Sequence, residues 1–108
     1  MKRSNNDIQK VKKIIVPILK RHQVKRASIF GSYARGEASK SSDIDLLIDF
    51  HGRKSLFDLS GLKIDLEDSL HKKVDLATPR SVSPFLKKYI YPDLVKIYEK
   101  AKRSKSVY

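Results

Sequence analysis

The feature that most constrains this chain is the alternation of acidic and apolar residues over positions 43–50, DIDLLIDF. A β-strand of this sequence would direct Ile44, Leu46, Ile48 and Phe50 to one face and Asp43, Asp45, Leu47 and Asp49 to the other. Asp43 and Asp45 then repel each other unless a positive charge lies between them. A divalent cation is the usual solution, because Mg²⁺ prefers one or two carboxylates together with phosphate oxygens. The alternation therefore predicts a metal-dependent site on one face of a strand.

A turn at Gly31-Ser32 precedes this strand and ends the short, largely apolar run 27–30. A glycine at such a turn lets a phosphate approach the backbone closely. Each feature alone also has an ordinary explanation, since Asp-x-Asp occurs on solvated strand faces and Gly-Ser occurs in plain turns. Here the two features occur together, with ten residues between Ser32 and Asp43.

The combined pattern resembles the nucleotidyltransferase signature of the DNA polymerase β superfamily, in which Gly-Ser is followed at this spacing by two alternating acids. The segments GSYARG (31–36) and SDIDL (42–46) are similar to those of minimal nucleotidyltransferases, and the similarity extends over most of the chain. The resemblance implies the nucleotidyltransferase fold, an α+β fold with a small mixed sheet of three or four strands flanked by helices.

The length of 108 residues predicts one domain, which we place at residues 1–99, followed by a basic and frayed tail at 100–108. The chain has no cysteine, which excludes disulfides and thiolate metal sites. It also has no apolar run long enough to span a bilayer and no signal-type N-terminus. We therefore expect a cytoplasmic protein that does not associate with membranes.

The formal net charge of +12 is unevenly distributed. Residues 1–26 carry nine Lys and Arg against one acid, and residues 80–108 carry eight against two, whereas residues 27–79 carry seven against nine. Basic flanks around an acidic centre suit an anionic substrate that is attracted by the field and held through metal ions. They are also compatible with nucleic acid or with a solubilised surface, and we favour the latter for the tail.

Hydrophobic periodicity predicts the secondary structure, including a second long helix whose apolar stripe contains Leu56 and whose solvated face carries Asp65, Glu67 and Asp68. The expected helices are 5–22, 32–35 with Gly36 as the C-cap, 56–71 and 81–89; the expected strands are 26–30, 43–50, 72–77 and, rather than a continued helix, 94–98. Pro17 should kink or break the first helix. The strand–helix–strand unit from 43 to 77 should be a right-handed parallel crossover, which brings Asp75 near Asp43 and Asp45.

The resemblance implies a role for each candidate site residue. Asp43, Asp45 and Asp75 would bind two Mg²⁺ ions, or Mn²⁺, with Asp75 also helping to deprotonate the acceptor hydroxyl. Four further residues are the predicted nucleotide and phosphate contacts: Gly31, Ser32, Arg35 and Ser42. Arg35 is equally well explained as a surface arginine, and Ser42 would orient Asp43 through a local hydrogen bond.

The same resemblance implies a function. The chain would transfer AMP from ATP to a hydroxyl acceptor, a tyrosine of a partner HEPN-domain toxin, and so act as its antitoxin. Two alternatives stay open: a non-catalytic antitoxin that blocks its partner sterically, and a nucleotidyltransferase that modifies a small molecule or an RNA end. A nucleic-acid-binding protein is less favoured, because only nine Phe and Tyr are available to interleave with the basic residues.

Overall fold

The computed structural model describes residues 3–39, 41–52 and 54–100. The predicted frayed tail therefore lies outside the described residues from position 101 onward. Within the described part, no helix is long and apolar enough to cross a membrane.

A four-stranded sheet in the order β3-β2-β1-β4 forms the centre of the molecule. Its strands are β1 (Val24–Phe30), β2 (Ile44–Phe50), β3 (Val74–Ala77) and β4 (Val95–Glu99). β1 is antiparallel to both β2 and β4, whereas β2 and β3 are parallel. The sheet is therefore mixed, and the expected placement of the third strand beside the second is confirmed.

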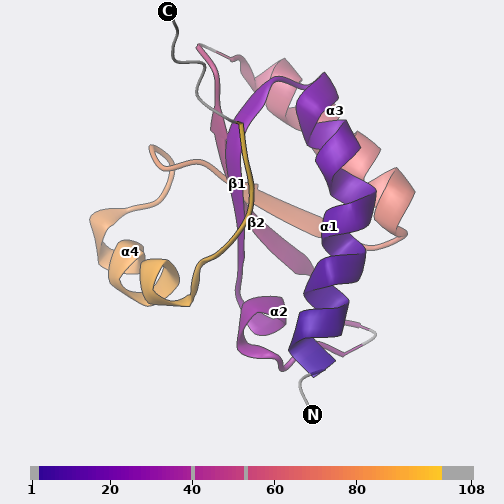
Figure 1. Ribbon diagram of the computed structural model, residues 1–108. Helices are drawn as coiled ribbons and strands as arrows, with labels where there is room; N and C mark the ends of the chain where they lie inside the picture. Colours follow the sequence, from indigo (N-terminus) through magenta and orange to yellow (C-terminus); the bar gives the residue numbers. More distant parts are fainter. Residues whose placement is uncertain (1–2, 40, 53, 101–108) are drawn as a thin grey trace, which may run out of the picture.

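Helices α1 (Arg3–Arg21) and α3 (Leu56–Leu70) cover one face of this sheet (Figure 1). The core lies between these two helices and the sheet. Its residues with no exposed surface include Ile15 and Leu19 of α1, Leu62 and Leu66 of α3, and Leu46 of β2. Burial of a side chain of this size contributes about 1.5–3 kcal/mol. The predicted alternation of β2 thus has its apolar face on this core, which leaves the acidic face on the other side of the sheet.

Across the opposite face of the sheet, no long helix packs among the residues that the structure describes. The segment that connects β3 to β4 runs along this side and contains the short helix α4 (Pro84–Ile90) and the 3-10 turn η1 (Tyr91–Asp93) (Figure 1). None of the residues of α4 and η1 is buried. We call this side of the sheet the open face.

Two details differ from the sequence-based expectations. α1 is one unbroken helix through Pro17, because Pro17 lies on the exposed side while Ile15, Ile18 and Leu19 hold both flanks in the core. Leu56, expected in the apolar stripe of the second long helix, is 80% exposed, since it stands at the first position of α3.

Candidate active site at the Gly-Ser turn and the strand ends

Three elements meet at the edge of the sheet where the predicted site residues lie. β1 ends at Phe30 and continues into the Gly31 turn, while β2 and β3 begin at the same edge because both run antiparallel to β1. Asp45 pairs in register with Phe30 on one side and with Asp75 on the other. The fold therefore brings together residues that are 30 positions apart in the sequence.

Asp45 and Asp75 interact directly. Their carboxyl groups share a hydrogen bond, and the pKa of Asp45 is raised from 3.8 to about 6. Burial is the largest cause, followed by the negative charge of Asp75 and the hydrogen bond to it, and then by the charge of Asp43; the positive charge of Arg35 opposes these effects. Asp45 is half-buried, whereas Asp43 and Asp75 are exposed. The site thus concentrates negative charge without enough nearby positive charge to balance it.

Gly31 makes the close approach of Asp45 possible. Its backbone has φ 76° and ψ −150°, a conformation that residues other than glycine rarely adopt. A Cβ atom at this position would lie 2.2 Å from Oδ2 of Asp45. The missing side chain thus makes room for the Asp45 carboxylate, in addition to the phosphate contact that the sequence predicts.

Ser32 is the first residue of α2 (Ser32–Arg35), and its carbonyl accepts a 2.8 Å hydrogen bond from Glu37 N–H. Gly36 closes this single turn in the left-handed conformation, as expected for a C-cap glycine. The next residue, Tyr33, is buried in the core cluster, so its side chain anchors the turn to the core. The turn at Gly31-Ser32 is therefore fixed on both sides next to Asp45.

Arg35 is held by two carboxylates. Its Nε donates to Glu37 Oε1 at 3.0 Å, and its Nη1 donates to Asp93 Oδ2 at 3.3 Å. These hydrogen bonds, that with Glu37 before that with Asp93, raise the pKa of Arg35. A phosphate would have to compete with both carboxylates for this guanidinium, so the predicted phosphate contact stays a prediction.

Ser42 takes part in the hydrogen bonds of its own loop. Its hydroxyl accepts from Ser39 N–H at 2.8 Å, and its carbonyl accepts from Lys72 Nζ at 3.1 Å. Among the described residues, the Ser42 hydroxyl makes no hydrogen bond to the Asp43 carboxylate. Lys72 was not among the sequence-predicted site residues, although the pair Lys72-Lys73 directly before Val74-Asp75 was the available signal.

The donor set fits a divalent cation that is completed by its substrate. Among residues 3–39, 41–52 and 54–100, no group of three or more His, Cys, Asp or Glu side chains is close enough to enclose a metal ion. Mg²⁺ seldom needs such a cage, because it usually takes one or two carboxylates and fills its remaining positions with water and substrate phosphates. Asp45 and Asp75 supply carboxylates of this kind. Burial, together with the charges of Asp75 and Asp43, raises the pKa of Asp45, an electrostatic cost that a bound cation would offset.

A strand-end carboxylate pair beside a Gly-Ser turn on a small mixed sheet defines the nucleotidyltransferase class, and comparisons with known proteins agree. The model of the family "Polymerase beta, Nucleotidyltransferase" matches residues 12–103, so the chain belongs to this family. The chain is 50% identical over 91 residues to "Putative protein adenylyltransferase MJ0435" of Methanocaldococcus jannaschii, covering 84% of this chain and 98% of that protein. It is 37% identical over 75 residues to protein adenylyltransferase MntA of Thermococcus cleftensis, covering 69% and 76% of the two chains.

Solved structures support the same fold. A structure described as a minimal nucleotidyltransferase superposes with a TM-score of 0.72 at 32% identity, covering 83% of this chain and 92% of the other. A toxin–antitoxin structure with AMP-PNP also gives a TM-score of 0.72, at 23% identity over 82% of this chain and 73% of the other. At that identity the second likeness shows the fold alone. The expected α+β nucleotidyltransferase fold is thereby confirmed.

Proposed function

We propose that this protein transfers AMP from ATP to a hydroxyl group of a protein, a tyrosine of a partner HEPN-domain toxin, and thereby acts as an antitoxin. The observation that carries this proposal is the direct contact between Asp45 and Asp75 beside Gly31. The relatives named protein adenylyltransferase support the reaction, and a related structure of an AMPylated HEPN toxin in complex with its MNT antitoxin supports the partner.

In the proposed reaction the acceptor oxygen forms a bond to the α-phosphorus, and the bond from that phosphorus to the bridging oxygen of the β-phosphate breaks. The products are an AMP ester of the acceptor and pyrophosphate. Divalent cations bound by the carboxylates supply charge neutralisation of the triphosphate and activation of the acceptor hydroxyl. Asp43, Asp45 and Asp75 would hold these cations, and Asp75 would also accept the proton of the attacking hydroxyl.

The remaining residues position the nucleotide. Ser32 offers its backbone N–H and hydroxyl to the β- and γ-phosphates from the turn that Gly31 begins. Arg35 gives a further phosphate contact when the triphosphate displaces Glu37 or Asp93 from its guanidinium. The net charge of +12 increases the rate at which an anionic substrate and an acidic acceptor surface approach.

The test uses ATP labelled at the α-phosphate, Mg²⁺ and a HEPN-domain protein as the acceptor. Wild-type protein should label the HEPN protein on tyrosine, and the double variant Asp43→Asn, Asp45→Asn should lose at least 100-fold in rate, as expected when electrostatic stabilisation is removed. Asp68→Asn on the exposed side of α3 is the matched control, because it makes the same chemical change away from the site.

Two outcomes contradict the proposal. If the double variant labels the acceptor as fast as wild type, the site assignment is wrong. If wild type never labels the HEPN protein but still blocks its toxicity, the protein is a steric antitoxin.

A further inference from the structure

A cavity of about 310 Å³ lies on the open face of the sheet, under the segment that connects β3 to β4. Its floor comes from the strands and its wall from the connecting segment, and the lining residues are Arg26, Ser28, Leu47, Asp49, Pro79, Tyr91 and Leu94. It shares Arg26, Asp49, Pro79 and Tyr91 with a neighbouring hollow of about 820 Å³. Ligand sites of small molecules typically measure about 300–1,000 Å³.

Ser28 is the unusual residue in this cavity. It is 8% exposed and is the one polar side chain in the buried class among the described residues. No hydrogen bond links its hydroxyl to any residue within 3–39, 41–52 and 54–100. Its neighbours Ala27 and Ile29 have no exposed surface and belong to the core cluster, so Ser28 points to the opposite, open face. An unsatisfied buried hydroxyl is costly, which indicates that a ligand or water completes it.

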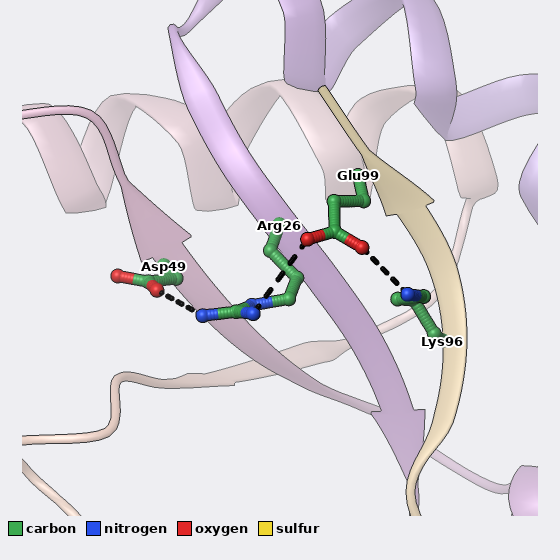
Figure 2. A network of polar contacts seen from close by, with 4 residues as sticks. All are labelled: Arg26, Asp49, Lys96 and Glu99. Carbon is green, nitrogen blue, oxygen red and sulfur yellow. Dashed lines mark hydrogen bonds and ion pairs between the residues drawn. The ribbon is translucent and has the colours of Figure 1, made fainter. Parts of the chain in front are cut away.

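Asp49 places a carboxylate at the same cavity. Its Oδ2 accepts a 2.9 Å hydrogen bond from Nη2 of Arg26, which also contacts Glu99 Oε2 at 3.7 Å (Figure 2). Lys96 donates to the other oxygen of Glu99 at 2.5 Å, so the row of charges crosses β2, β1 and β4. Arg26 fixes Asp49 through Oδ2 and leaves Oδ1 without a partner among the described residues. The cavity therefore offers one hydroxyl and one carboxylate oxygen, beside the Arg26 guanidinium that also lines it.

The remaining walls are apolar. Leu47 lies on the floor, and Pro79, Leu94 and Tyr91 of η1 line the walls. Nζ of Lys87 lies 5.9 Å from the centroid of the Tyr91 ring, so one face of this ring is left for a further partner. Two hydrogen-bonding atoms at one side and apolar or aromatic surfaces around them match a nucleobase, which has polar edges and π-faces.

The cavity is also at the right place for the base of a bound nucleotide. Leu47 follows Asp45 on the same face of β2, one alternation or about 7 Å along the strand. A triphosphate held at Asp45 and Ser32 can therefore extend its ribose along the open face. We propose that this cavity binds the purine base of the nucleotide, with Tyr91 stacking on the ring and with Ser28 and Asp49 hydrogen-bonding to its edge. This inference rests on the proposed function and adds the subsite that recognises the base.

The test compares ATP with inorganic tripolyphosphate, which lacks the base and ribose. Their dissociation constants are measured by calorimetry with Mg²⁺ and without acceptor, for wild type, Ser28→Ala, Tyr91→Ala and Tyr91→Phe. Tyr91→Ala should weaken ATP binding by about 5- to 100-fold, the range expected for loss of one stacked base, and Ser28→Ala by about 5-fold. Tripolyphosphate binding should not change in any variant, and Tyr91→Phe should bind ATP like wild type because it keeps the ring.

The outcomes separate this inference from the proposed function. If Ser28→Ala and Tyr91→Ala bind ATP as tightly as wild type, the base lies elsewhere; if they also lose transfer to the HEPN protein, the cavity holds the acceptor instead. Equal loss of tripolyphosphate binding would mean a general disturbance of the site and would also overturn the base assignment. If wild type binds neither ATP nor tripolyphosphate, the proposed function itself fails.

Discussion

At the scale of single residues, the carboxylates that suit the site for cation binding also repel one another and so destabilise the folded chain. The pKa of Asp45 lies at about 6 because the folded chain buries its carboxylate beside Asp75 and Asp43. Uncompensated charge of this kind is frequent where a protein binds a cation or performs catalysis. Its cost to the metal-free protein can be measured.

We expect Asp45→Asn to stabilise the metal-free protein above pH 6 and to have no effect below about pH 4. The folded-state pKa of about 6 exceeds the ordinary value of 3.8, so the folded protein binds more protons between these pH values, and its stability decreases as the pH rises through this range. The difference corresponds to at most about 3 kcal/mol, which partial exposure of Asp45 reduces to about 1–2 kcal/mol.

Urea denaturation in the presence of EDTA at both ends of this range measures the effect. Asp68→Asn on α3 is the control, because it makes the same chemical change outside the site and keeps Asp45. Equal stabilisation by Asp45→Asn at low and high pH would contradict an electrostatic origin.

The second residue-scale prediction concerns Gly31. We expect Gly31→Ala to destabilise the protein by about 1–3 kcal/mol through its backbone conformation, and further because its Cβ would displace the Asp45 carboxylate. Gly52 is the matched control: it has φ 69°, and no atom lies within 4 Å of a Cβ built on it. Gly52→Ala should therefore pay only the backbone cost and leave nucleotide transfer unchanged. Equal losses of transfer activity in the two variants would show that Asp45 is not displaced.

At the scale of elements, connections between distant segments hold the site in place. His22, at the end of α1, lies 2.7 Å from Asp65 of α3 through Nε2 and Oδ2. Glu67, also on α3, accepts a 2.9 Å hydrogen bond from Val74 N–H at the start of β3. The second contact fixes the backbone directly before Asp75.

Glu67 therefore gives a test of how α3 positions β3. Glu67→Ala should cost about 1–3 kcal/mol, because the Val74 N–H at a buried position loses its acceptor. Glu67→Gln should restore most of this loss, since its amide oxygen can accept the same hydrogen bond. Chemical denaturation measures the stability, and amide hydrogen exchange of Val74 reports the bond directly. If the Ala and Gln variants are equally unstable, the charge rather than the hydrogen bond is what matters.

The sequence predicted the elements better than their long-range contacts. Local periodicity located α2, β2, β3 and α4 within a few residues, and the parallel crossover placed Asp75 beside Asp45. Local periodicity could not predict that Asp93, 58 positions away, would pair with the Arg35 guanidinium. An ion pair of this kind depends on where the α4 segment folds back onto the sheet. For the same reason Asp65 and Glu67 were interpreted as a solvated face, although both have partners in the structure.

At the scale of the whole molecule, the two faces of the sheet have separate tasks. Helices α1 and α3 cover the face that contains the core (Figure 1). The open face contains the carboxylate pair, the cavity at Ser28 and the charged row of Arg26, Asp49 and Glu99. Figure 2 shows this charged row. A domain of this size has one modest core, so stability and ligand binding are divided between opposite sides of four strands. A ligand on the open face can then stabilise the fold without rearranging the core.

This division leads to a prediction about cooperative binding. ATP alone brings negative charge toward Asp45 and Asp75 and should bind weakly, and Mg²⁺ alone lacks the phosphate oxygens that complete its coordination. Together they should raise the melting temperature far more than the sum of their separate effects, by roughly 10 °C at a hundredfold excess over the dissociation constant, since such binding contributes about 2.7 kcal/mol. Thermal unfolding with Mg²⁺, with ATP in EDTA, and with both ligands measures the three shifts.

In the Asp45→Asn variant, the shift with both ligands should fall to the sum of the shifts with each ligand alone. If ATP in EDTA stabilises wild type as much as ATP with Mg²⁺, the carboxylates do not act through a cation. In that case the protein's own basic residues must overcome the repulsion between the carboxylates and the triphosphate.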